Sequence, residues 1–74
     1  MITAKDAKKI YDDENKSRGD EAVSVKDAGD FFVITPKLKS CLGVAIISKD
    51  GKMSRINHPS QEMMKKIFSA KIIF

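Results

Sequence analysis

The spacing of apolar and polar residues changes along the chain, and the first part has a helical period. Apolar residues recur there on one helical face, at Ala4, Ala7, Ile10 and Tyr11. Thr3 precedes this stretch and is a good N-cap, because its hydroxyl can accept from the N–H groups of the first turn. Gly19 can supply the left-handed residue that ends a helix. The pattern therefore predicts a helix over residues 4–17.

The middle of the chain changes to strand-like composition, with apolar and β-branched residues between turn signals. Four strands are predicted, at residues 21–26, Phe31–Thr35, Val44–Ser48 and Met53–Ile56.

The first two predicted strands differ in their alternation. Between residues 21 and 26, Val23 and Val25 face one way and the polar residues face the other, which is typical of a half-exposed strand near an edge. Residues 31–35 are apolar on both faces, which indicates a central strand covered on both sides. Pro36 ends that strand, because proline lacks the N–H that a ladder requires.

The last two predicted strands flank Asp50-Gly51, a strong hairpin signal. We expect a type I′ turn there, with positive φ at both central residues. The connection from Lys37 to Gly43 is longer than a tight hairpin needs, which favours a bulge or a surface loop.

The end of the chain returns to a helical period. Pro59 suits a first helical turn, and a helix is predicted over residues 59–69. Its apolar face comprises Met63, Met64, Ile67 and Phe68. This face is predicted to be core, and a protein-binding surface at Met63 and Met64 is the alternative. Residues 70–74 are mostly apolar, and either extend this helix or add a short edge strand.

The order of these elements predicts a single α+β domain over residues 1–74. An N-terminal helix precedes a four-stranded antiparallel sheet, and a C-terminal helix packs on one face to give two layers. The apolar fraction of 42% and the charged fraction of 32% are typical of a soluble globular domain.

Composition and the chain's start suggest a compartment. The single cysteine, Cys41, cannot form an internal disulfide. The first residues lack the basic and apolar regions of a signal peptide, and no apolar run approaches the roughly 20 residues of a membrane span. We therefore expect a cytoplasmic protein that does not bind membranes.

Charge is unevenly distributed. Residues 1–35 carry six Lys/Arg and eight Asp/Glu, net −2, whereas residues 36–74 carry eight and two, net +6. This asymmetry fits an acidic protein surface or nucleic acid as partner of the C-terminal half, or a solvated lysine-rich face.

Catalytic and metal-binding patterns are weak. Cys41 and His58 could in principle serve as a nucleophile and its base. Cys41 is more simply a small apolar group, and His58 is more simply a turn residue. One Cys and one His fall short of a zinc site, and no run matches a calcium loop. The glycines are isolated, and caps or turns explain them. We predict no catalytic residue, no metal site and no cofactor.

Binding is the remaining class of function. Loops held by a rigid sheet often carry function, so the predicted partner-binding residues lie in the long connection and around the hairpin. They are basic residues that we expect to be exposed, namely Lys37, Lys39, Lys49, Lys52 and Arg55. A nucleic-acid-binding module using the same residues is the alternative, although arginines are few and the strand aromatics are not interleaved with basic residues. Self-association through an edge strand or through Ile72, Ile73 and Phe74 is a further expectation.

Two stretches resemble a known family. Gly29-Asp30-Phe31-Phe32-Val33, and Val44 to Gly51 with its Asp-Gly turn, are similar to the YrhB-like family of small bacterial immunity proteins. The helix-then-sheet order is similar to that of PepSY-type domains. The family tends to have Trp or Tyr where this chain has Phe31-Phe32. The resemblance implies a protein that works by binding and occludes a toxin or another protein partner. Together with the basic charge, this leads us to expect a non-enzymatic protein-binding module, of the toxin-immunity or phage-encoded inhibitor type, whose partner is a toxin or another acidic protein.

Overall fold

The structure is a computed structural model that describes residues 1–38 and 43–73. In chain order its elements are α1 (Ala4–Asn15), the 3₁₀ turn η1 (Lys16–Arg18), β1 (Ala22–Asp27), β2 (Phe31–Pro36), β3 (Val44–Ser48), β4 (Met53–Ile56), α2 (Gln61–Ser69) and β5 (Lys71–Ile72). The predicted small α+β domain with an antiparallel sheet is confirmed. The sheet has five strands instead of four, in the order β4-β3-β2-β1-β5.

Helix α1 begins at a capping box, as the residues around Thr3 predict. The Asp6 N–H donates to the Thr3 hydroxyl at 3.3 Å, and the Thr3 N–H donates to the Asp6 carboxylate at 3.0 Å. The helix tightens into η1 and ends at Gly19, whose φ of +70° is left-handed. The predicted helix is therefore confirmed, with its last turn of 3₁₀ type.

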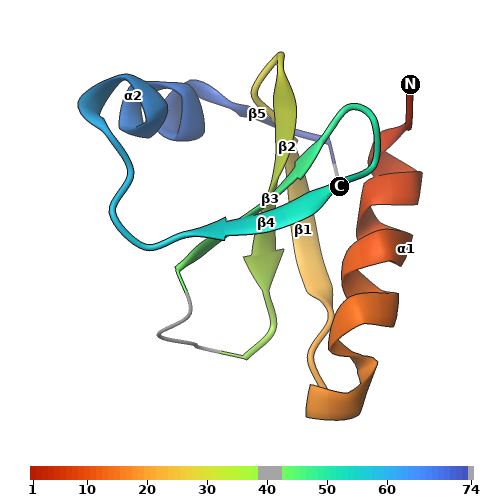
Figure 1. The fold of residues 1–74 in the computed structure, drawn as a ribbon. Helices are drawn as coiled ribbons and strands as arrows, with labels where there is room; N and C mark the ends of the chain where they lie inside the picture. The colour runs from red at the N-terminus through yellow and green to blue at the C-terminus, as the bar shows by residue number, and fades with distance from the viewer. Residues whose placement is uncertain (39–42, 74) are drawn as a thin grey trace.

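The main core lies between α1 and one face of the sheet. Figure 1 shows α1 beside the sheet, at the right of the molecule. Tyr11, Val25 and Ile47 are fully buried there. The α1 face of the sheet contributes Phe32, Ile34 and Ala45 as well.

Strand β2 lies in the middle of the sheet, between β1 and β3. Its first four residues, Phe31 to Ile34, are all buried, although their side chains alternate between the two faces. Phe32 and Ile34 belong to the α1 core, whereas Phe31 and Val33 lie outside that cluster. The prediction of a central strand covered on both faces is confirmed.

Strand β1 lies near an edge of the sheet, as predicted, with the two-residue strand β5 beyond it. It pairs with β2 on one side and with β5 on the other. The register shifts between Ala22 and Ser24, so that Val23 is an extra residue and its side chain is 61% exposed, while Val25 is fully buried. The expected common face of Val23 and Val25 is therefore wrong, because a bulge interrupts the alternation.

The β3–β4 hairpin lies where Asp50-Gly51 predicts it, but its turn differs. Only glycines have positive φ among the described residues, so Asp50 does not adopt the type I′ conformation. The Gly51 N–H donates to the Ser48 carbonyl at 2.9 Å, and Gly51 itself has a φ of +94°. This is a three-residue loop with a left-handed glycine at its end.

Helix α2 starts later than predicted, because Ser60 is its N-cap and Pro59 precedes it. The Ser60 hydroxyl accepts from the Met63 N–H at 3.2 Å. The chain then forms β5, which settles the two alternatives for the last residues in favour of an edge strand, and Ile72 lies opposite Lys26 of β1. Phe74 lies outside the described residues.

Helix α2 lies over a face of the sheet, on the side opposite α1 (Figure 1). The chain leaves β4 at one edge of the sheet and returns as β5 at the other, so α2 belongs to the segment that crosses this second face. No residue of α2 is buried. Its apolar side chains were predicted to be core, but Met63, Met64 and Ile67 are only half-buried. No helix in the described part of the chain is long and apolar enough to span a membrane.

Candidate protein-binding surface

Two of the five predicted binding residues are engaged inside the domain. Lys49 is half-buried, and its ammonium lies 3.0 Å from the Asp27 carboxylate and 4.0 Å from the centre of the Phe32 ring. The pKa of Asp27 is lowered most by the hydrogen bond from the Gly29 N–H and next by the Lys49 ammonium, because both stabilise the charged carboxylate. Lys49 was expected to be an exposed residue, but it joins the hairpin to the β1–β2 turn.

Arg55 is also half-buried, on the α1 side of β4. Its guanidinium donates to the Asn15 side-chain carbonyl at 2.8 Å and lies 5.6 Å from the centre of the Tyr11 ring. The long side chain therefore packs across the end of α1. Like Lys49, it is not the exposed basic residue that the sequence pattern suggested.

The remaining predicted residues do not form one patch. Lys37 and Lys52 are exposed, but β2 and β3 are antiparallel with Phe31 opposite Ser48. Lys52 therefore lies at the end of the sheet where β2 begins, and Lys37 lies at the end where β2 finishes. Lys39 lies outside the described residues. A role for these residues in binding remains a prediction.

A buried polar network near Lys37 is not indicated by any sequence pattern. The Asp20 carboxylate is buried and accepts the Tyr11 hydroxyl at 2.6 Å, the Glu21 N–H at 2.9 Å and the Leu38 N–H at 3.0 Å. Burial by itself would raise the pKa of Asp20, but the hydrogen bonds from Tyr11, Leu38 and Glu21 outweigh it, so the pKa is lowered. The network ties α1 to the start of the connection after β2.

The sequence gives no local sign of this network, because its members are nine and 18 residues apart. An aspartate after a glycine is usually a turn residue in solvent.

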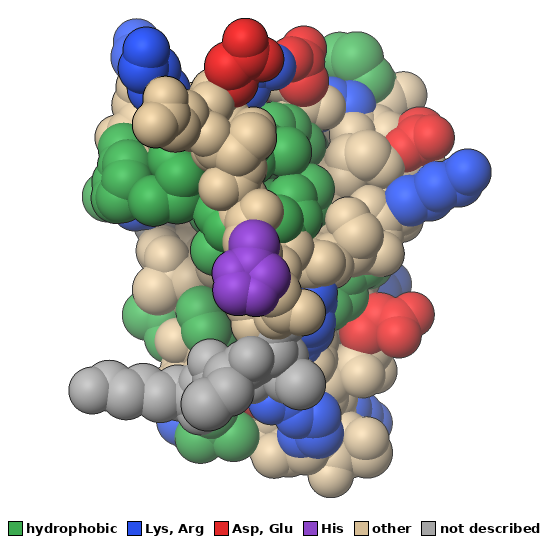
Figure 2. All heavy atoms as spheres, turned by 60° about the vertical axis from the view of Figure 1, so that its left-hand side comes forward, with side chains coloured by type: hydrophobic (Ala, Val, Ile, Leu, Met, Phe, Trp, Pro, Cys, Tyr) green, Lys and Arg blue, Asp and Glu red, His purple; other side chains and the backbone are tan. Residues whose placement is uncertain are grey.

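Exposed apolar side chains concentrate at the end of the described chain. Among the described residues, the large hydrophobic side chains that are exposed include Phe68 at 77%, Ile72 at 67% and Ile73 at 49%. We call residues 61–73, which form α2 and β5, the α2–β5 surface. Figure 2 brings the α2 side of the molecule forward and shows hydrophobic side chains gathered in its upper half, above His58.

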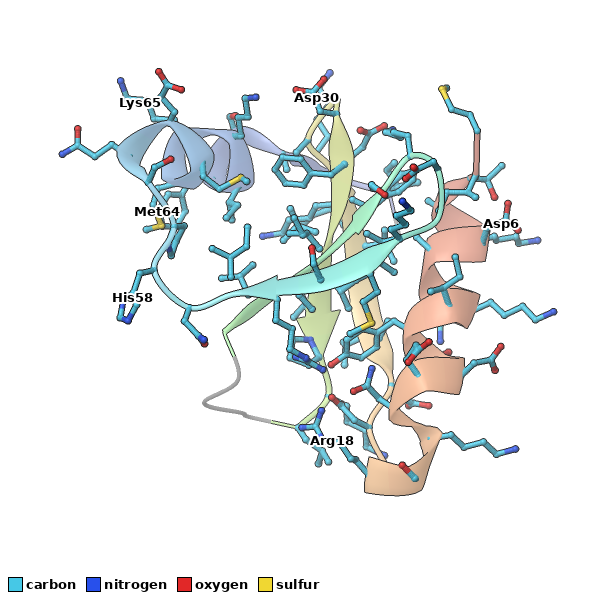
Figure 3. All side chains as sticks on the ribbon, viewed as in Figure 1. Asp6, Arg18, Asp30, His58, Met64 and Lys65 are labelled. Carbon is cyan, nitrogen blue, oxygen red and sulfur yellow. The ribbon has the colours of Figure 1, made fainter. Side chains whose placement is uncertain are left out.

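The charged residues of the α2–β5 surface are mainly basic. It carries Lys65, Lys66 and Lys71 against a single acid, Glu62, which gives a net charge of +2. Lys66 lies 3.1 Å from the Asp30 carboxylate, but both side chains are more than half exposed, at 51% and 77%, so this pair is screened by solvent. In Figure 3, Lys65 points to the upper rim of α2, whereas Met64 lies below it.

Of the two residues considered for catalysis, the structure describes His58. His58 is exposed and points outward from the crossing segment (Figure 3). Cys41 lies outside the described residues. Residues 1–38 and 43–73 contain neither a pocket nor a group of three side chains suited to hold a metal ion.

Comparison of this chain with protein-family models, with curated proteins and with solved structures found no match.

Proposed function

We propose that this domain is a non-enzymatic protein-binding module, of the kind that inhibits a toxin or another protein by covering part of its surface. One observation carries the proposal, namely the exposure of Phe68 and Ile72 within the α2–β5 surface. Single exposed apolar residues are ordinary, but several of them on two consecutive elements without buried residues are typical of a surface that a partner covers.

The position of this surface supports the same function. The α1 side of the sheet holds the main core, whereas α2 on the other side contributes no buried residue. A partner that covers α2 would add the apolar contacts that the domain itself does not make. An inhibitor of this type needs no catalytic group, because occlusion acts through the contact area alone.

The proposal is tested by finding a partner and measuring its inhibition. The tagged full chain is incubated with nuclease-treated extract of its own cells, and with the purified products of the reading frames beside its gene. We expect one protein to form an equimolar complex in sedimentation experiments and to lose its activity or toxicity when bound. Purified neighbours that neither bind nor lose activity, together with recovery of nucleic acid alone from untreated extract, would contradict the proposal.

Nucleic-acid binding is the second candidate, and the net charge of +6 in residues 36–74 favours it. Such binding releases counterions, so its affinity falls by orders of magnitude between low and moderate salt. A mobility-shift series that shows no complex at low salt excludes this candidate.

A further inference from the structure

We propose that the α2–β5 surface binds an acidic segment of a partner protein that carries large apolar side chains. This inference rests on the proposed protein-binding function, and adds to it the location of the interface and the chemistry of the partner. It replaces the hairpin residues Lys49 and Lys52 as the expected centre of contact.

The apolar part of the surface supplies the anchors. Phe68 is 77% exposed and lies one helical turn after Met64, so the two side chains share a stripe on α2. Ile72 follows in β5 and is 67% exposed. Ile72 lies opposite Lys26, which in turn lies opposite Val33, so all three belong to the face of the sheet that α2 crosses. An aromatic side chain beside aliphatic ones is a common arrangement at the centre of protein interfaces.

The charges around these anchors select an acidic partner. Lys65, Lys66 and Lys71 are all exposed, and Glu62 is the single acid of the surface. Asp30 partly neutralises Lys66, and Lys71 lies opposite Asp27 on the α1 face of the sheet. Lys65 and Lys26, which lies opposite Ile72, are therefore left as the principal basic groups on the face that α2 crosses. Complementary charge on the partner would speed association and exclude basic competitors.

The same charges disfavour a second copy of this chain as the occupant. A symmetric dimer through the α2–β5 surface would bring the same patch of each subunit together, and would therefore place lysines against lysines. The composition of the anchors disfavours nucleic acid, because bases stack on aromatic rings and Phe68 alone of the three anchors offers one.

The test uses three synthetic helical peptides with the ¹⁵N-labelled full chain, followed by amide chemical shifts. The first peptide has leucines on one face and glutamates on the other. The second replaces the glutamates with lysines, and the third replaces the leucines with serines. We expect only the first to shift the amides of residues 61–73, with an affinity that falls severalfold between about 50 and 300 mM NaCl.

Two substitutions test the anchors and the charge separately. Phe68→Ser should weaken binding of the first peptide at least about tenfold, and Lys65→Glu should weaken it about threefold to tenfold. Both side chains are exposed, so the amide spectra should remain those of a folded domain. The matched controls are Val23→Ser, which removes an exposed apolar residue from β1, and Lys5→Glu, which reverses an exposed charge on α1. Neither control should change the affinity.

Several outcomes would overturn the inference. No shift with the first peptide would do so, as would equal shifts with the lysine peptide. A dimer that dissociates in Phe68→Ser would identify a second copy as the occupant, and shifts in residues 61–73 with a single-stranded oligonucleotide would identify nucleic acid. If a natural partner binds Phe68→Ser and Lys65→Glu as tightly as the parent protein, the proposed function stands and this location is wrong.

Discussion

The hydroxyl group of Tyr11 should have a large effect on stability for a single atom. Tyr11 is fully buried, and its hydroxyl donates at 2.6 Å to the Asp20 carboxylate, which is itself 4% exposed. Tyr11→Phe removes this donor and keeps the ring under Arg55. A hydrogen bond to a charged group contributes about 1.5–3 kcal/mol, and its loss leaves Asp20 with two backbone N–H donors. We therefore expect Tyr11→Phe to lower the free energy of unfolding by about 1.5–3 kcal/mol.

Urea unfolding followed by far-ultraviolet circular dichroism measures this loss, because the chain has no tryptophan to serve as a fluorescent probe. With a slope of about 1 kcal/mol per molar urea, the midpoint should fall by about 1.5–3 M. In an Asp20→Asn background the same substitution should cost less, because the charge that strengthens the bond is gone. A loss below about 0.5 kcal/mol, or equal losses in both backgrounds, would refute the reasoning.

The pH dependence of stability gives an independent test of the same bond. The pKa of Asp20 is lowered in the folded state, so its stabilising effect is present above its ordinary value of 3.8 and is lost as the pH falls through the folded pKa. Burial, and to a smaller extent the hydrogen bond to Asp20, raise the pKa of Tyr11. The stability that the neutral Tyr11 hydroxyl contributes is therefore present below pH 10 and is lost as the pH rises through the folded pKa. Tyr11→Phe should reduce the loss of stability at acid pH, and should abolish the part of the loss of stability at alkaline pH that is due to Tyr11. An unchanged profile would contradict both assignments.

Three further predictions concern the sheet and its loops. Phe32→Ala should cost about 3–5 kcal/mol and unfold most of the population by circular dichroism, because the ring is 2% exposed; a folded variant would show that β2 is not central. Gly43→Ala should lower the melting temperature more than Gly29→Ala. Both glycines have positive φ, but a Cβ at Gly43 would lie 2.6 Å from a backbone oxygen and one at Gly29 would meet nothing within 4 Å, so equal effects would be inconsistent with the structure. Lys49→Met should destabilise the domain in urea more than Lys52→Met, because Lys49 pairs with Asp27, and the reverse order would show that this pair does not stabilise the fold.

The predicted fold follows closely from the sequence where the signal is local. The capping residues of α1 and the four apolar residues of β2 act within one turn or one strand, and the structure places them as their spacing predicts. The hairpin position is equally local, although its turn type is not. Gly51 alone takes the left-handed conformation, so three residues form the loop and Asp50 needs no positive φ.

The candidate site depended on contacts between distant segments. The five basic residues share a charge, but the packing of α1 takes up Arg55 and the β1–β2 turn takes up Lys49. A list of residue types contains no information on which side chains another element will reach. For the same reason, the apolar stripe of α2 predicted a buried face, whereas its exposure depends on how closely the helix approaches the sheet.

The sequence by itself determined the helices, four of the five strands and the antiparallel α+β class, because hydrophobic period, caps and turn residues operate over a few neighbouring positions. The tertiary structure decided the rest. It placed β5 beside β1, buried Asp20 against Tyr11, and left Phe68 and Ile72 exposed. Each of these depends on which surfaces meet across the chain, and two segments with the same pattern can be core or interface according to what lies against them.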